Sequence, residues 1–124
     1  MEELLNKFPV YTDRLKISLM DTESIDWYIQ EVKQPRYYKY LNDKRIAKID
    51  EENIRYILLY IINSYENKQN INNIRLVIYK DNQRCGSIIL LNKINNSIEL
   101  AYWISEKSEG NGIITESIIS YLFK

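Results

Sequence analysis

The residues that could do chemistry in this chain lie in a short polar segment, residues 105–112, which holds two of the three glycines, Gly110 and Gly112. The stretch before it, Ser97–Ile104, is rich in β-branched and aromatic residues and predicts a strand. The stretch after it, Ile113–Phe123, returns to an apolar helical pattern. A turn of this kind leaves the first N–H groups of the helix without intrahelical partners, at the positive end of its dipole. The spacing therefore predicts a phosphate site.

Two common phosphate-binding motifs do not fit this turn. A dinucleotide-binding fingerprint needs a third glycine, and position 115 holds threonine. A Walker A loop needs lysine and then serine or threonine after its last glycine, whereas Gly112 is followed by Ile113 and Ile114. The turn therefore belongs to neither group.

Composition narrows the classes of protein. The chain has 124 residues and a formal net charge of zero, which predicts a single domain over residues 1–124 and does not favour nucleic acid or an anionic membrane. It has one cysteine, Cys85, and no histidine, so an internal disulfide and histidine-based catalysis or metal binding are excluded. No leader-like or membrane-spanning apolar run is visible, and we expect a cytoplasmic protein.

The elements that must position the turn begin with a strand and two helices. Leu15, Ile17 and Leu19 alternate with polar residues and predict a half-buried strand. Asp21 or Thr22 is expected to cap a helix that ends before Pro35, and Asp50 to cap a second one. The apolar stripe of the first helix is Ile25, Tyr28, Ile29 and Val32; that of the second is Ile54, Ile57, Leu58, Ile61, Ile62 and Tyr65.

A three-stranded antiparallel meander follows, formed by Ile74–Tyr79, Arg84–Leu91 and Ser97–Ile104. Asp81-Asn82 and Asn95-Asn96 are expected to form its turns. An isolated glycine inside a strand, Gly86, indicates a bulge or a close backbone approach. Its neighbour Cys85 is expected to be a core residue rather than a nucleophile. Because strands and helices are segregated along the chain, the sequence predicts an α+β fold.

The segment Lys33–Lys48 carries six basic residues, one acidic residue and three tyrosines. Basic residues mixed with aromatic ones can bind single-stranded nucleic acid. A solvated connection whose tyrosines pack on the core is the interpretation we favour, because the rest of the chain offsets this charge. A third interpretation is that the segment forms one wall of a binding pocket.

Four segments in order resemble the GCN5-related N-acetyltransferases (GNAT), most closely the RimJ/RimL type that acetylates protein N-termini. They are TDRLKI from Thr12, GSIIL from Gly86, ELAYWI from Glu99 and GNGIITES from Gly110. The family's pyrophosphate motif has arginine or glutamine where this chain has Lys107, a departure that keeps the cation. The resemblance implies the GNAT acyltransferase fold, a mostly antiparallel sheet with flanking helices, and acetyl-CoA as co-substrate without a metal.

The resemblance also implies roles for individual residues. Lys107, Asn111 and the backbone N–H groups from Gly110 through Ile113 would hold the pyrophosphate, with Thr115 as a hydroxyl donor. The strand residues Tyr102, Trp103 and Ile104 would pair with the pantetheine amides through their backbone. The other interpretation is that the side chains of Leu100, Tyr102 and Ile104 are ordinary core residues; both can hold, because pairing with the cofactor uses the backbone.

Glu99 is the candidate general base, which would take the proton of the attacking amine through a water. The other interpretation is a surface or salt-bridged glutamate. Glu116 lies in the first turns of the helix, where acidic residues complement the dipole, and we interpret it as structural.

The family normally continues beyond the helix at Ile113–Phe123 with further strands, which this sequence lacks. We therefore expect a truncated GNAT domain whose last strand keeps an open edge, with weak or no activity alone and dimerisation through that edge. The acceptor implied is a protein N-terminus, with an aminoglycoside or other small amine as the alternative. A catalytically inactive binding module is the alternative to an enzyme.

Overall fold

The computed structural model describes residues 2–34, 50–68, 71–92 and 97–122. In this part of the chain five strands form one sheet in the order β1-β2-β3-β4-β5, and each neighbouring pair is antiparallel. The strands are β1 (Val10–Tyr11), β2 (Leu15–Leu19), β3 (Asn73–Lys80), β4 (Gln83–Asn92) and β5 (Ile98–Ile104). The helices are α1 (Glu2–Leu5), α2 (Ile25–Val32), α5 (Glu51–Asn67) and α6 (Ile113–Leu122). The predicted α+β class is confirmed.

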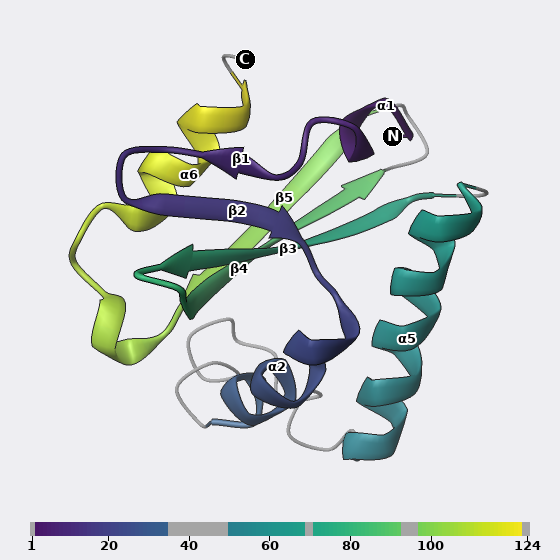
Figure 1. Cartoon of the computed structure of the whole chain (residues 1–124). Helices are drawn as coiled ribbons and strands as arrows, with labels where there is room; N and C mark the ends of the chain where they lie inside the picture. Colours follow the sequence, from purple (N-terminus) through teal and green to yellow (C-terminus); the bar gives the residue numbers. More distant parts are fainter. Residues whose placement is uncertain (1, 35–49, 69–70, 93–96, 123–124) are drawn as a thin grey trace.

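Two apolar clusters pack against the sheet, because successive side chains of a strand point to opposite faces; α5 contributes to both, with Leu58 in one and Ile61 in the other. Helices α2 and α5 lie on one side of the sheet, and α6 lies on the other (Figure 1). Val77 of β3 and Trp103 of β5 pack with Leu58 of α5 in one cluster. Ile88 of β4 packs with Ile113 of α6 in the other. Both clusters therefore depend on the alternation of apolar residues along the strands.

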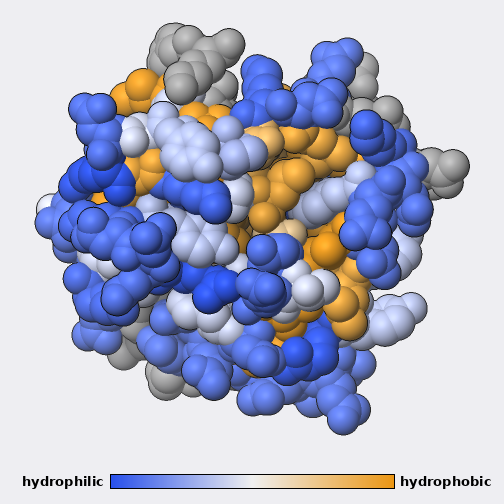
Figure 2. Space-filling model, in the orientation of Figure 1, coloured by the Kyte–Doolittle hydropathy of each residue, from blue (hydrophilic) through white to orange (hydrophobic). Residues whose placement is uncertain are grey.

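Helix α5 begins as predicted, but its apolar face is narrower than predicted. The Asp50 carboxylate accepts a hydrogen bond from the backbone N–H of Asn53 at 2.8 Å, which confirms the N-cap. Ile57 is 46% exposed, so its assignment to the buried face is wrong. At about 100° per residue, Ile57 lies roughly 90° from the centre of that face. Figure 2 shows hydrophobic surface gathered between the sheet and α5, where apolar side chains of this kind stay partly uncovered.

The start of α2 also differs from the prediction. A 3-10 turn, Thr22–Ser24, precedes the helix, and neither Asp21 nor Thr22 caps α2 with its side chain. Asp21 instead accepts a hydrogen bond from the Ser24 hydroxyl at 3.1 Å. The carboxylate therefore stabilises the extra turn, which moves the helix start to Ile25.

The β3–β4 hairpin follows the prediction closely. Asp81 and Asn82 form its two-residue turn and both have positive φ, 52° and 62°. The register of the pair shifts between Ile78 and Tyr79, which leaves Cys85 as the extra residue of a bulge. Cys85 is buried, and burial raises the pKa of its thiol to about 11. The core assignment of Cys85 is confirmed, and the thiolate that a nucleophile needs is disfavoured.

Gly86 satisfies both interpretations of a strand glycine. It follows the bulged residue, and it lies against the last residues of β5. A Cβ built on Gly86 would lie 2.8 Å from the carbonyl oxygen of Trp103 and 2.8 Å from Cδ1 of Ile104. The glycine therefore sets how closely β4 and β5 approach at the end of β5.

Three predictions fall outside the described residues, or mostly so: the Asn95-Asn96 turn, the helix stop at Pro35 and the basic segment Lys33–Lys48. The sequence pattern also missed β1, because two residues, Val10 and Tyr11, are too few to show alternation.

Candidate functional site

The predicted strand–turn–helix around the two glycines is present. After β5, the backbone N–H of Ser105 donates to the carbonyl of Cys85 at 2.7 Å, and a 3-10 turn covers Glu106–Ser108. Gly110 and Gly112 then adopt positive φ, 81° and 69°, a region that L side chains rarely occupy. The first hydrogen bond of α6 runs from the N–H of Glu116 to the carbonyl of Gly112 at 3.0 Å. The N–H groups just before Glu116 are therefore the unpaired donors of the helix start.

The turn is fastened to the beginning of β2 by side chains far away in sequence. Arg14 donates from its NH2 group to the carbonyl of Asn111 at 2.5 Å and from Nε to Glu116 Oε1 at 2.8 Å. Thr12 donates from its hydroxyl to Glu116 Oε2 at 2.5 Å. The hydrogen bond from Thr12, together with Arg14, lowers the pKa of the Glu116 carboxyl below its usual value. The structural role of Glu116 is confirmed, whereas its partners Thr12 and Arg14 could not be read from the sequence.

Strand β5 forms an outer edge of the sheet, and within the described residues β4 is its one neighbour. Leu100 is 37% exposed and Tyr102 is 50% exposed, so the core interpretation of these two residues is wrong. Ile104 is half-buried and packs against the core cluster that includes Ile113. No described helix covers the rest of this face of β5, which leaves an apolar strand surface at the outer edge of the described sheet.

Trp103 points to the opposite face and is buried. Its ring lies 5.2 Å from that of Trp27 and 5.4 Å from that of Tyr28, measured between centroids. These aromatic contacts attach β5 to α2. Residues 102–104 are thereby packed against α2 on the Trp103 face, while the Tyr102 side chain on the opposite face is half exposed.

Glu99 lies near the opposite end of β5 from the turn. It is exposed, stands across from Leu91 of β4, and shares a strand face with Ala101 and Trp103. Ile104 lies five positions further along the chain, or roughly 16 Å along a strand. Its position on an edge strand is compatible with the role of general base, which stays a prediction.

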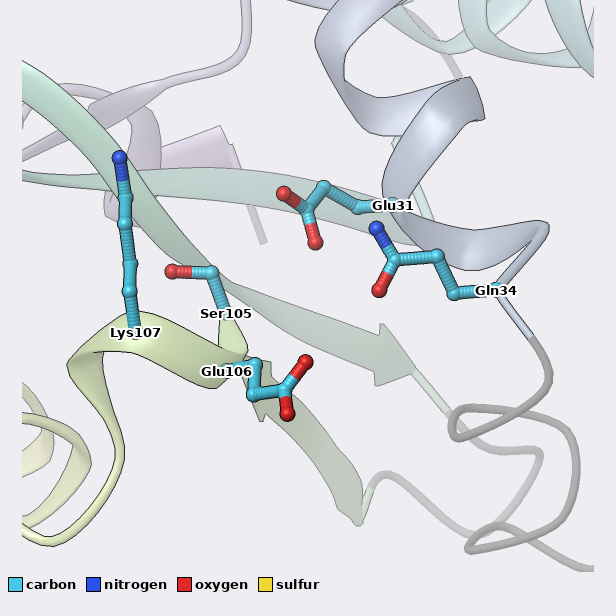
Figure 3. Close-up of a pocket in the computed structure, with 5 residues that line it drawn as sticks. All are labelled: Glu31, Gln34, Ser105, Glu106 and Lys107. Carbon is cyan, nitrogen blue, oxygen red and sulfur yellow. The ribbon is translucent and has the colours of Figure 1, made fainter.

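Lys107 and the glycines line different hollows. Lys107 lies on a cavity of about 420 Å³ between the C-terminal end of α2 and the segment after β5. Figure 3 shows Glu31 from α2, and Gln34 from just beyond its end, reaching toward this segment, with Lys107 on the opposite wall. Gly112 and Thr115 line a second hollow of about 680 Å³, whose other walls are Tyr11, Thr12, Glu116, Ile119 and Ser120. The structure therefore does not bring the Lys107 side chain together with Gly112 and Thr115 in one cavity.

None of the helices in the described ranges is both long and apolar enough to cross a membrane.

Comparisons with known proteins agree with the architecture. No protein-family model matches the chain. A putative ribosomal N-acetyltransferase, YdaF, of Bacillus subtilis (strain 168), is 37% identical over 59 residues, which are 44% of this chain and 32% of that protein. The structure of RimL, a ribosomal L7/L12 alpha-N-protein acetyltransferase in complex with coenzyme A, matches with a TM-score of 0.71 and 18% identity, over 90% of this chain and 63% of RimL.

The structure of a probable acetyltransferase matches with a TM-score of 0.65 and 26% identity, over 91% of this chain and 65% of that one. The chain thus spans about a third of the length of the curated relative and less than two thirds of these structures. The predicted resemblance is confirmed: the chain has the GNAT acyltransferase fold, and the proteins it resembles are acetyltransferases of the RimL kind.

Proposed function

We propose that this chain is the cofactor-binding portion of an acetyl-CoA-dependent N-acetyltransferase that acts on a primary amine, the N-terminus of a protein. One observation carries the proposal: a glycine turn with positive φ at Gly110 and Gly112 joins an open edge strand to a helix N-terminus in the GNAT fold. The solved RimL structure contains coenzyme A, and the YdaF and RimL names both refer to ribosomal acetylation.

The turn fits a pyrophosphate group. A Cβ built on Gly110 would meet no atom within 4 Å, so space is open beside the backbone where a ligand must approach. N–H groups from Gly110 through Ile113 would hold the pyrophosphate, with Thr115, which is exposed, as a hydroxyl donor and Asn111 as part of the turn. Lys107 would act as a cation at the rim, because its side chain faces the neighbouring cavity.

The outer edge of β5, beyond which the described residues form no further strand, fits an extended ligand that pairs with its backbone. Tyr102, Trp103 and Ile104 would offer backbone N–H and C=O groups to the pantetheine amides, and one N–H would polarise the thioester carbonyl. Bound acetyl-CoA supplies an activated acetyl group. The amine nitrogen bonds to the acetyl carbon, the C–S bond breaks, and Glu99 would accept the proton that the amine loses, through a water.

The cavity between α2 and the segment after β5 supports an amine acceptor. Two carboxylates, Glu31 and Glu106, and one ammonium group, Lys107, line it, so its charge favours a cation. A protein N-terminus brings a single amine, whereas an aminoglycoside brings several and would need more carboxylates. The cytoplasm is the compartment we assign, and the buried thiol of Cys85 suits a reducing environment.

Acetyl-CoA binding is the first test. Millimolar acetyl-CoA should raise the melting temperature, since a ligand at 100 times its Kd stabilises the folded state by about 2.7 kcal/mol. Gly110→Ala should abolish this rise, because the new methyl group would occupy the ligand's space. Asn82→Ala is the matched control: it also places alanine at positive φ, 62°, but in the distant hairpin turn. No melting shift in the unsubstituted chain would contradict the proposal.

Turnover is the second test. Release of coenzyme A thiol should appear with peptides that have a free N-terminus, and not with the same peptides when the N-terminus is blocked. Turnover with aminoglycosides alone would support the small-amine alternative. Binding without turnover would support an inactive binding module. Size-exclusion chromatography with and without acetyl-CoA would show whether a second copy occupies the β5 edge instead.

A further inference from the structure

We propose that Arg14 is the positioning residue of the glycine turn: it orients the turn for an anion and neutralises the carboxylate of Glu116 beside it. This inference rests on the proposed cofactor site. Arg14 lies at the start of β2, 97 residues before Asn111 and 102 before Glu116, and contacts both.

The bond to Asn111 decides which way one peptide group of the turn faces. In a trans peptide the carbonyl and the next N–H point in opposite directions. Arg14 holds the Asn111 carbonyl toward β2, at 2.5 Å, and the N–H of Gly112 therefore points away from Arg14. A carbonyl turned the other way would present a partial negative charge to a phosphate. The guanidinium thus selects the peptide orientation in which the turn can bind an anion.

The bond to Glu116 removes an opposing charge. Glu116 lies one residue after Thr115, in the first turn of α6, where its negative charge would repel a bound pyrophosphate. Arg14 Nε lies 2.8 Å from Glu116 Oε1, so the charges of the two groups offset each other. The hydroxyl of Thr12 occupies the second carboxylate oxygen at 2.5 Å.

Arg14 is itself held in place by the segment that precedes β2. The backbone N–H of Thr12 donates to the carbonyl of Leu15 at 2.9 Å, and the N–H of Leu15 returns a bond to the Thr12 hydroxyl at 2.9 Å. This tight turn ends at a strand residue that is buried in the core. Thr12 and Arg14 therefore fix the position of the glycine turn relative to the sheet.

The ion pair contributes little to folding, because its side chains are 37% and 31% exposed. Its effect should therefore appear in ligand affinity more than in stability. Arg14→Met should weaken coenzyme A binding about tenfold, or ~1.4 kcal/mol. Arg14→Lys keeps the charge but has one donor nitrogen, which cannot reach both partners. Its affinity for coenzyme A should lie between that of the unsubstituted chain and that of Arg14→Met.

The experiment is calorimetric titration of the full chain with coenzyme A, together with amide hydrogen exchange and thermal unfolding of each variant without ligand. Arg55→Met is the matched control, because it breaks a comparable exposed pair, Arg55 to Asp26 at 2.6 Å, between α5 and α2. We expect lower affinity and faster exchange at residues 110–113 in Arg14→Met, with Arg55→Met unchanged in both.

Equal affinity and exchange in Arg14→Met and the unsubstituted chain would overturn the inference. Equal losses in Arg14→Met and Arg55→Met would overturn it as well, because the effect would then be one of general stability. If the unsubstituted chain binds no coenzyme A, the proposed function fails on its own. The exchange rates at residues 110–113 still decide whether Arg14 orders the turn.

Discussion

Replacing Gly86 with alanine would place a methyl group where β4 meets the end of β5. The new Cβ would lie 2.8 Å from the Trp103 carbonyl oxygen, closer than real Cβ atoms come to other atoms. The other neighbour, Cδ1 of Ile104, can rotate away, but a backbone carbonyl moves only if the strand moves. The substitution should therefore displace the last residues of β5, on which the proposed pantetheine contacts depend.

The expected cost is that of overpacking a well-packed core, about 1–3 kcal/mol. At about 4 °C per kcal/mol for a domain of this size, the melting temperature should fall by about 4–12 °C. Coenzyme A affinity should fall further than stability alone explains, because the edge of β5 shifts relative to the glycine turn.

Ser87→Ala is the matched control, one residue along β4. Ser87 is fully buried and its hydroxyl donates to the carbonyl of Leu76 at 2.7 Å, so its loss costs about 0.5–1.5 kcal/mol without adding an atom. Thermal unfolding and calorimetric titration of both variants separate the two effects. A Gly86→Ala protein with unchanged melting temperature and affinity would refute the argument that glycine is required at this approach.

Three further predictions concern single residues. If Glu99 is the general base, Glu99→Gln should lower kcat by about 10²–10⁴; unchanged turnover would exclude that role. Burial raises the pKa of Tyr65 to about 12 from 10.0, so its protonated form is favoured by folding; the corresponding stability should be present below pH 10 and lost as the pH rises through 12, and Tyr65→Phe should lack this loss in alkaline unfolding. Cys85 should resist alkylation by iodoacetamide at pH 8 in the folded chain and react in denaturant, because its thiol is buried and its pKa is raised to about 11; equal rates would show that the core opens readily.

The features predicted best from the sequence are those that depend on local spacing. Asp50 caps α5, Asp81-Asn82 turns the hairpin, and a glycine turn joins β5 to α6, because each effect acts within a few residues. The misplaced residues, Ile57, Leu100 and Tyr102, are apolar side chains whose burial depends on what lies across from them. A periodic pattern marks the apolar face of an element, but another layer must cover that face for its residues to be buried.

The contact between Arg14 and Glu116 shows a different limit of sequence reasoning. TDRL and the TES of the glycine segment belong to separate parts of the resemblance, and nothing in one sequence relates residues 102 positions apart. The fold brings them together, because α6 packs against β1 and β2. The contact links the two segments physically: Arg14, at the start of β2, offsets the negative charge of Glu116 beside the proposed anion site. The loss of coenzyme A affinity in Arg14→Met, compared with the unchanged affinity of Arg55→Met, measures this contribution of Arg14 directly.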